Sequence, residues 1–289
     1  IHEGYPYLYL DISYLKQSLI EECSTMITEP LKYLNDDNII RFIDDYICIM
    51  MLLGNDFMPK IKWMTISQNG HQLLLEIYFQ LYNGNDSIDC EKDNQFLYNR
   101  TTGKINKVFL GDFIRILSTN ENKLARKFFN KRRKPYLHMD KKMTEYERQL
   151  KKLEFLPLQH TNHEISILLP IDDKNIWHER YYKLCHNIIP TIENRNQIVG
   201  DYLHTFLWNI QYYLHGYKSC DWDWYYHYDY SPTLLDIHNY LEVNNINQTI
   251  KLSTAIPKPL SPLELLSVVL PESNKLLMST ELYKKMCKF

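Results

Sequence analysis

One carboxylate stands at an unusual place in the sequence, where a long apolar run ends in a tight turn. Residues 44–60 read DDYICIMMLLGNDFMPK, so Asp56 follows Gly54 and precedes Pro59. An aspartate after Gly-Asn often caps a following helix, because its side chain accepts backbone N–H bonds. A carboxylate with a fixed direction beside a buried segment also suits Mg²⁺, which prefers hard oxygen ligands. On these residues alone both interpretations stay open.

Two further acids, Asp44 and Asp45, lead into the apolar run. One carboxylate cannot hold two metal ions, so both are candidate metal ligands beside Asp56. They stand about three helical turns before Asp56, at the far end of the helix that the run predicts. This position favours N-terminal caps over ligands.

A second unusual stretch is rich in aromatic residues. Residues 220–232 read CDWDWYYHYDYSP, in which six of the thirteen residues are Trp or Tyr. Such a segment can form a plug that locks a loop onto a neighbouring helix, with the tyrosine hydroxyls on polar partners. It can also offer rings on which nucleobases stack. Composition favours the plug.

A third stretch is strongly basic. Residues 126–135 read RKFFNKRRKP, with six basic residues and no acid. Arg132 and Arg133 at its centre could contact phosphates, or the run could direct nuclear import. A solvated helix face is the plainer interpretation.

Composition sets the broad class. The chain has 289 residues, 45% hydrophobic and 24% charged, with a formal net charge of −2. This charge excludes a uniformly basic nucleic-acid binder but allows a local basic groove. The six cysteines show no zinc-binding spacing, and no apolar run reaches the length of a membrane span. We therefore expect reduced cysteines, no membrane partner, and a cytoplasmic or nuclear location. The opening residues enter an ordered segment at once, which predicts a piece of a larger chain.

Apolar periodicity close to 3.6 residues predicts a mainly α fold with few, short strands. A charged stretch over residues 122–155 predicts one or two helices that project from the body, and residues 160–174 predict a linker. The remaining helices are expected at residues 14–23, 39–53, 70–82, 108–117, 177–186, 198–215 and 263–269.

Three motifs, in this order, resemble the XRN family of 5′→3′ exoribonucleases. DDYICIMMLLGNDFMP resembles the family's GNDFLP segment, and residues 200–237 resemble its second conserved region, which ends in SWxWYYPYHYAP. Residues 256–286 resemble the segment that follows, and the opening YPYLYLDISYLKQSL is similar to the stretch before GNDF. The chain departs from the family at His227, where the family has proline, and at Met58.

The resemblance implies a flap-endonuclease-like or PIN-like nuclease core that is mainly α here and α/β once its missing N-terminal part is added. Residues 1–120 would be the C-terminal part of that core, including the GNDF motif. Residues 121–175 would be a charged helical insertion or linker. Residues 176–289 would be the helical second conserved region with the Trp/Tyr-rich segment.

The resemblance also implies a mechanism, in which two Mg²⁺ (or Mn²⁺) ions hydrolyse single-stranded RNA with a 5′-monophosphate, processively. Asp56 would be the metal ligand that this chain supplies, and the missing N-terminal catalytic segment would supply the other acids and the phosphate pocket. Trp222 or Trp224 would stack a base or line the RNA channel, with Trp208 a further candidate. Alternatively, the chain is a catalytically inactive domain that binds RNA or protein, or a structural interaction protein.

Overall fold

The computed structural model describes most of the chain as helix and confirms the mainly α class. The described residues are 9–26, 36–84, 96–132, 140, 143–155, 176–249, 260–270 and 279–280. None of the helices in these ranges combines the length and apolar character that crossing a membrane requires.

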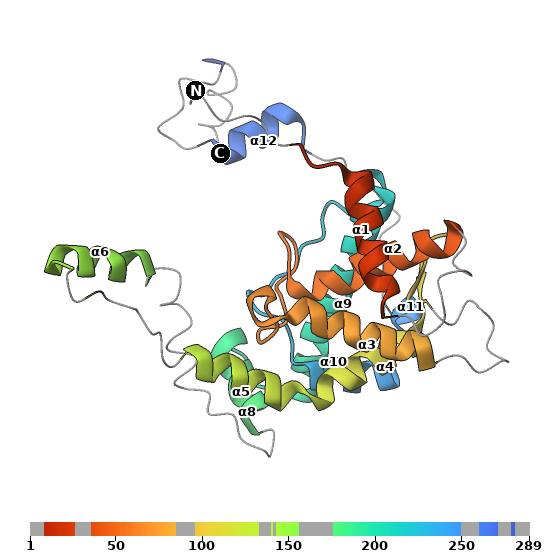
Figure 1. Ribbon diagram of the computed structural model, residues 1–289, viewed down its shortest axis with the longest axis horizontal. Coiled ribbons are helices and arrows are strands. Elements are labelled where there is room, and N and C mark those ends of the chain that lie inside the picture. The colour runs from red at the N-terminus through yellow and green to blue at the C-terminus, as the bar shows by residue number, and fades with distance from the viewer. Residues whose placement is uncertain are drawn as a thin grey trace.

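Figure 1 shows the arrangement of the helices. The described connections between them contain 3₁₀ turns at Met51–Leu53, Ile66–Gln68 and Tyr217–Ser219 and a π-helical turn at Tyr182–His186. The strands β1 (Tyr98–Asn99) and β2 (Lys104–Ile105) pair antiparallel. The helices are α1 (Ile12–Ser24), α2 (Asp36–Met50), α3 (Gly70–Gly84), α4 (Lys107–Thr119), α5 (Glu121–Arg132), α6 (Glu145–Phe155), α8 (Ile176–Tyr181), α9 (Ile192–His215), α10 (Leu234–Val243), α11 (Ile246–Thr249) and α12 (Pro262–Val269).

A single hydrophobic core joins the first, middle and last parts of the chain. Helix α4 lies at its centre, because α10 and α3 both pack against it, and α9 packs on α10. Phe113 of α4, Phe128 of α5 and Trp177 of α8 are each at most 1% exposed. The division at residues 120 and 175 stays a prediction, and the three parts share this core.

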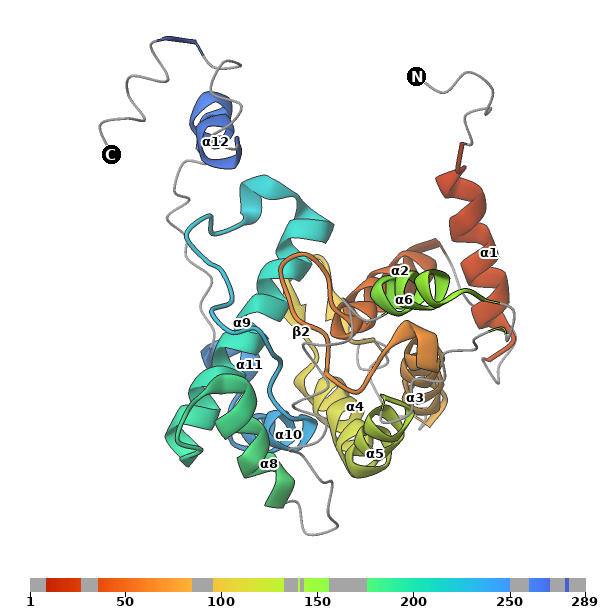
Figure 2. The ribbon, with the colours of Figure 1, turned by 90° about the vertical axis from the view of Figure 1, so that its left-hand side faces the viewer.

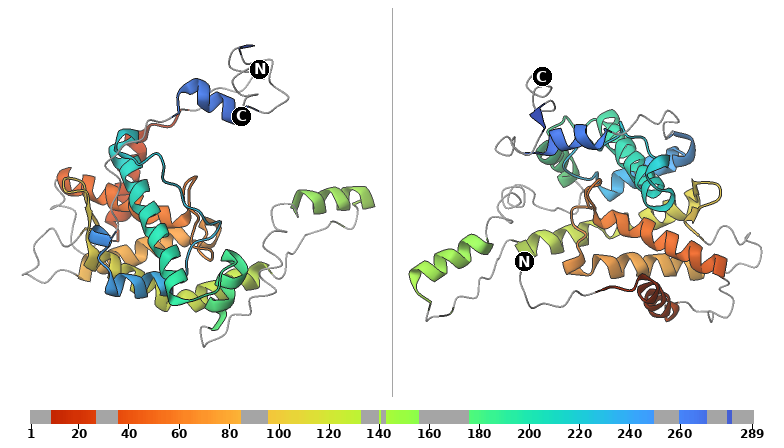
Figure 3. Two further views of the ribbon diagram at one scale, coloured as in Figure 1. Left: turned by 180° about the vertical axis from the view of Figure 1, so that it is seen from behind. Right: turned by 90° about the horizontal axis from the view of Figure 1, so that it is seen from above.

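The charged middle stretch forms two helices, as one of the alternatives predicts, but only one of them projects. Ala125 and Phe128 of α5 are buried in the core, so the expectation that this part of the stretch projects is wrong. Helix α6 lies apart from the body in Figures 1 and 3, and its Tyr146 is 74% exposed. Helix α5 packs against α4, which places its apolar side chains in the core. The expected linker lies outside the described residues.

One buried carboxylate, Glu121, ties three helices together. It stands at the start of α5 and accepts hydrogen bonds from the backbone N–H groups of Leu234 (2.6 Å) and Leu235 (3.0 Å). These N–H groups belong to the first residues of α10, so the N-terminus of α10 is capped by an acid from another helix. His178 of α8 lies 3.4 Å from the same carboxylate. Helix α10 has no counterpart among the helices expected from the sequence.

The acids Asp44 and Asp45 are not helix caps, so that prediction is wrong. Helix α2 begins at Asp36, which places both acids well inside it. Asp45 accepts hydrogen bonds from the backbone N–H groups of Leu97 (2.7 Å) and Tyr98 (2.8 Å) and from the Tyr78 hydroxyl (2.9 Å). Asp44 forms a two-point ion pair with Arg100, which also lies in the β-hairpin. The two acids therefore anchor the hairpin to α2.

This anchor predicts a large loss of stability for Asp45→Ala. The carboxylate is fully buried, and its removal leaves three buried donors without an acceptor. Each such donor costs about 1–3 kcal/mol, so we expect the free energy of unfolding to fall by about 3 kcal/mol or more. Urea denaturation measures it. Asp112→Ala, which breaks an exposed pair with Arg115, is the control and should cost less than about 1 kcal/mol. Equal losses in the two variants would contradict the anchor.

Candidate functional site

The turn that follows α2 is built by Asn55. Its side-chain Oδ1 accepts hydrogen bonds from the backbone N–H groups of Phe57 and Met58, each at 3.0 Å. The backbone N–H of Asn55 donates to the Met58 carbonyl at 3.0 Å. Gly54 precedes it at φ 87°, in the region that favours glycine. The asparagine thus closes residues 54–58 into a compact turn.

Because Asn55 closes the turn, the neighbouring Asp56 carboxylate points into solvent. Asp56 is exposed and accepts no hydrogen bond from the described residues. No helix begins directly after it, since the next helical turn is Ile66–Gln68. The helix-cap interpretation of Asp56 is therefore wrong. The metal-ligand interpretation stays a prediction, and the carboxylate is available for it.

Helix α9 holds this turn in place. The Asn55 side-chain amide donates to the Asn209 side chain at 3.1 Å, and the Asn209 amide donates to the Thr205 carbonyl one turn back at 2.9 Å. The Phe57 ring packs against Trp208 and Tyr212 of α9, with centroids 5.0 and 5.1 Å away. Figure 2 shows the turn lying beside α9.

A further contact extends the hold of α9 to the residues that follow Asp56. The Tyr202 hydroxyl donates to the Pro59 carbonyl at 3.2 Å. Burial, and secondly the Asp56 carboxylate, raise the pKa of Tyr213 of α9. Asp56 therefore has a defined position without a hydrogen bond of its own.

The tryptophans of the candidate site differ in their surroundings. Trp208 is 7% exposed, and its indole N–H donates to the Asp221 carbonyl at 2.7 Å. Trp224 is half-buried, stacks on His204 at 3.7 Å between centroids, and donates to the Thr205 hydroxyl at 3.1 Å. Trp222 is 38% exposed. Of the three, Trp208 contacts the turn that carries Asp56, through Phe57.

The rest of the aromatic segment is extended, with alternate residues facing the protein. Tyr226, Tyr228 and Tyr230 face inward, and the Tyr226 hydroxyl donates to the Tyr230 carbonyl at 2.9 Å. Tyr225 and His227 face outward, with ring centroids 4.1 Å apart. One face of the segment is thus the aromatic plug that composition favours, while the other face stays open.

The remaining candidate residues do not gather around Asp56. Burial raises the pKa of Asp45 to about 7, although its three hydrogen bonds act in the opposite direction. Asp44 is ion-paired with Arg100. Both carboxylates are thus used within the fold. The side chain of Arg132, at the end of α5, and the whole of Arg133 lie outside what the structure describes. Within the described ranges, no three His, Cys, Asp or Glu side chains cluster to hold a metal.

Sequence reasoning missed Asn55 and Asn209, the residues that position Asp56. An asparagine in a Gly-Asn-Asp turn carries a signal, because Asn often bonds to the backbone two residues on. Asn209 carries only the weaker signal of a polar residue on the buried face of a helix, which needs a partner. The sequence cannot pair residues so far apart.

Comparison with known proteins gives matches over most of the chain. The family described as "Xrn1 helical domain" matches residues 36–166 and 173–287. The human "5'-3' exoribonuclease 1" is 23% identical over 289 aligned residues, which cover 92% of this chain and 16% of that protein. The "5'-3' exoribonuclease 2 homolog" of Caenorhabditis elegans is 32% identical over 111 residues, 38% of this chain and 11% of that protein. The chain spans only a small part of these relatives.

The geometry of the turn predicts unequal effects from alanine at two glycines with positive φ. Gly54 (φ 87°) and Gly216 (φ 83°) lie in a backbone region open almost only to glycine, so an alanine at either position would be strained by about 1–3 kcal/mol. A Cβ at Gly54 would also stand 2.8 Å from the Lys60 backbone nitrogen, whereas nothing lies within 4 Å at Gly216. We expect Gly54→Ala to lower the free energy of unfolding clearly more than Gly216→Ala in urea titrations. Matching losses would show that the turn is loosely packed.

Proposed function

Because the chain belongs to the Xrn1 helical domain family, we propose that it is the helical part of a 5′→3′ exoribonuclease. The relatives in that family carry this activity in their names. The observation that carries the proposal is the Asp56 carboxylate, which is exposed, fixed in place by α9, and without a hydrogen bond from the described residues.

Asp56 would serve as one ligand of a site for Mg²⁺ or Mn²⁺. An exposed carboxylate on a rigid turn fits this use, since these ions bind through one or two carboxylates and keep several waters. With Asp56 and further acids as ligands, the metal would supply activation of water and stabilisation of the leaving oxygen in phosphodiester hydrolysis. The other acids would come from the N-terminal catalytic segment, because Asp44 and Asp45 are engaged elsewhere.

The chain's own residues would position this ligand and border the RNA. Asn55 directs the Asp56 carboxylate outward, and Asn209 keeps the turn against α9. Trp208 would form the wall of the channel nearest Asp56, through its contact with Phe57. Trp222, the most exposed of the three tryptophans, would offer a ring for a base of single-stranded RNA.

We further propose that the substrate is single-stranded RNA with a 5′-monophosphate and that degradation is processive. The phosphate pocket and the rest of the metal site would lie in the N-terminal catalytic segment that the family resemblance implies. A cytoplasmic or nuclear location remains an expectation from composition and family resemblance. The competing proposal is a domain that has lost its chemistry and binds RNA or protein.

The proposal predicts that Asp56→Ala in the complete protein abolishes hydrolysis and leaves the fold intact. Losing an outer-shell partner of a metal site costs about 10–100-fold, so losing a direct ligand should lower kcat by more than about 100-fold. Release of nucleotides from 5′-monophosphorylated RNA in Mg²⁺ measures it. The melting temperature should stay unchanged, because the carboxylate accepts no hydrogen bond from the described residues.

Asp112→Ala, an exposed acid on α4, is the matched control and should keep full activity. If Asp56→Ala retains its specific activity, Asp56 is not a metal ligand. If the unaltered complete protein binds RNA without degrading it, the inactive domain is the correct alternative.

The tryptophans of the aromatic segment should respond differently to truncation. Trp224→Ala removes the stack on His204 and a hydrogen bond. Because Trp224 is half-buried, we expect a loss of about 2–3 kcal/mol, below the 3–5 kcal/mol of fully buried aromatic rings. Trp222→Ala should leave stability nearly unchanged and weaken binding of single-stranded RNA by about 1–3 kcal/mol. Thermal melts and RNA titrations separate the two effects. Early melting and normal RNA binding in both variants would reduce the segment to a plug.

A further inference from the structure

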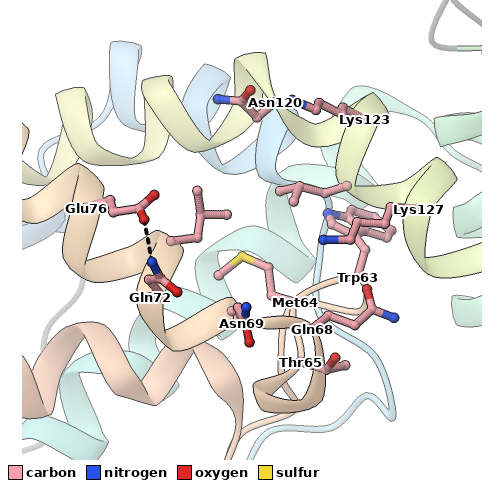
Figure 4. Close-up of a pocket in the computed structure, with 13 residues that line it drawn as sticks. Trp63, Met64, Thr65, Gln68, Asn69, Gln72, Glu76, Asn120, Lys123 and Lys127 are labelled. Atoms are coloured by element: carbon pink, nitrogen blue, oxygen red, sulfur yellow. Dashed lines mark hydrogen bonds between the residues drawn. The ribbon is translucent and has the colours of Figure 1, made fainter.

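A cavity lies between α3, α5 and the segment that leads into α3, away from the turn that carries Asp56. Its volume is about 300 Å³, at the lower end of the range for small-molecule sites, and none of its lining residues belongs to α9 or to residues 54–60. Figure 4 shows the cavity with its lining side chains. The proposed exoribonuclease chemistry does not use it.

One wall of the cavity carries a buried donor without an acceptor. Trp63 is 1% exposed, and its indole Nε1–H has no hydrogen-bond acceptor among the described residues. The ring cannot turn away easily, because it packs edge-on against Trp177 and Tyr181 at 5.1 and 5.5 Å. A buried donor left unpaired is unfavourable, and a ligand acceptor would satisfy it once the side chains that cover Nε1 move aside, because that atom is itself buried.

The same end of the cavity is positively charged. Lys127 lies beside Trp63 in Figure 4, and Lys123, one helical turn earlier on α5, lines the cavity beside Asn120. One lysine of the basic run of residues 126–135 therefore lines this cavity. Two ammonium groups and an indole N–H together favour an acceptor with several charged oxygens, which is the chemistry of a phosphate.

The opposite end of the cavity has different chemistry. Glu76 accepts a hydrogen bond from the Gln72 side chain at 2.9 Å, and Figure 4 shows both at the end away from Lys127. An acid there disfavours a second anion but accepts from hydroxyl or amino groups. Met64 lies between the two ends in Figure 4, and Leu73 is a further apolar residue of the lining. The cavity thus suits a molecule with a phosphate at one end and a neutral, hydrogen-bonding body.

From this polarity and size we propose that the cavity binds a nucleoside monophosphate. Its phosphate accepts from the Trp63 Nε1–H and pairs with Lys127 and Lys123. Its base and ribose cover Met64 and Leu73, and a hydroxyl or amino group donates to Glu76. The inference rests on this cavity alone and stands independently of the proposed exoribonuclease activity.

Calorimetric titration of the complete protein with AMP tests the proposal. The double variant Lys123→Ala/Lys127→Ala should bind AMP at least about tenfold more weakly, since it loses two charge-assisted contacts. The matched control is Lys104→Ala/Lys107→Ala, which removes two exposed lysines that do not line the cavity. It should bind AMP as the unaltered protein does. AMP bound at any other site contributes equally to both double variants.

Two further titrations sharpen the result. Trp63→Phe removes the N–H and keeps an aromatic ring, so AMP should bind more weakly while the folded state persists; if this variant does not fold, the lysine variants decide. Inorganic phosphate, which lacks a body to reach Glu76, should bind more weakly than AMP. Equal AMP affinity in the two lysine double variants, or no AMP binding at millimolar concentration, would overturn the proposal. So would weaker binding of an RNA oligonucleotide but not of AMP in Lys123→Ala/Lys127→Ala.

Discussion

The hydrogen bond between Asn55 and Asn209 is the contact on which the candidate site depends. It joins a turn to a helix more than 150 residues away in the sequence, at 3.1 Å. Asn55 uses its oxygen to close its own turn and its amide to reach α9. Because one side chain performs both tasks, the direction of the Asp56 carboxylate and the position of α9 are fixed together. The packing of Phe57 on Trp208 reinforces this link.

The middle of α2 shows why the turn can be held so firmly. Asp44 and Asp45 bind the β-hairpin midway along α2, and the helix then runs directly into the 3₁₀ turn Met51–Leu53 that precedes Gly54. The turn is therefore fixed from both sides, by α2 on one and by α9 on the other. Asp45 is buried and hydrogen-bonded, whereas Asp56 is exposed without a hydrogen bond from the described residues. The two carboxylates thus have opposite uses within one short stretch of sequence.

Much of the helical fold follows from the sequence, because each long helix has a clear apolar period. The helices expected at residues 70–82 and 108–117 lie within α3 and α4. The helix expected at residues 39–53 starts three residues after α2, whose first turn holds acids rather than apolar residues. Asp44 and Asp45 lie inside both ranges, so the interpretation as caps came from their place before the apolar run. Helix α10 was missed because its start depends on Glu121, an acid from another helix. Its ten residues give few turns of periodicity.

In the candidate site, too, the sequence predicts the features with a local pattern and misses those that depend on distant contacts. The sequence singled out Asp56 from the local pattern of an apolar run, a glycine and a proline. It also identified the aromatic segment, whose period-2 alternation follows from its extended backbone. It could not rank Trp208 above Trp222 and Trp224 as the neighbour of Asp56, because that order depends on which ring meets Phe57. Contacts between distant segments carry no local signal, and Asn209 is the clearest example.

A double-mutant cycle between Asn55 and Asn209 tests the central claim most directly. Asn55→Ala, Asn209→Ala and the double variant are compared for the free energy of unfolding and, in the complete protein, for kcat/KM on 5′-monophosphorylated RNA. If the two side chains position Asp56 together, the single effects should not add, and the coupling energy should reach about 0.5–3 kcal/mol in both measurements. Effects that add to within about 0.3–0.5 kcal/mol in both would show that α9 does not hold the turn through this contact.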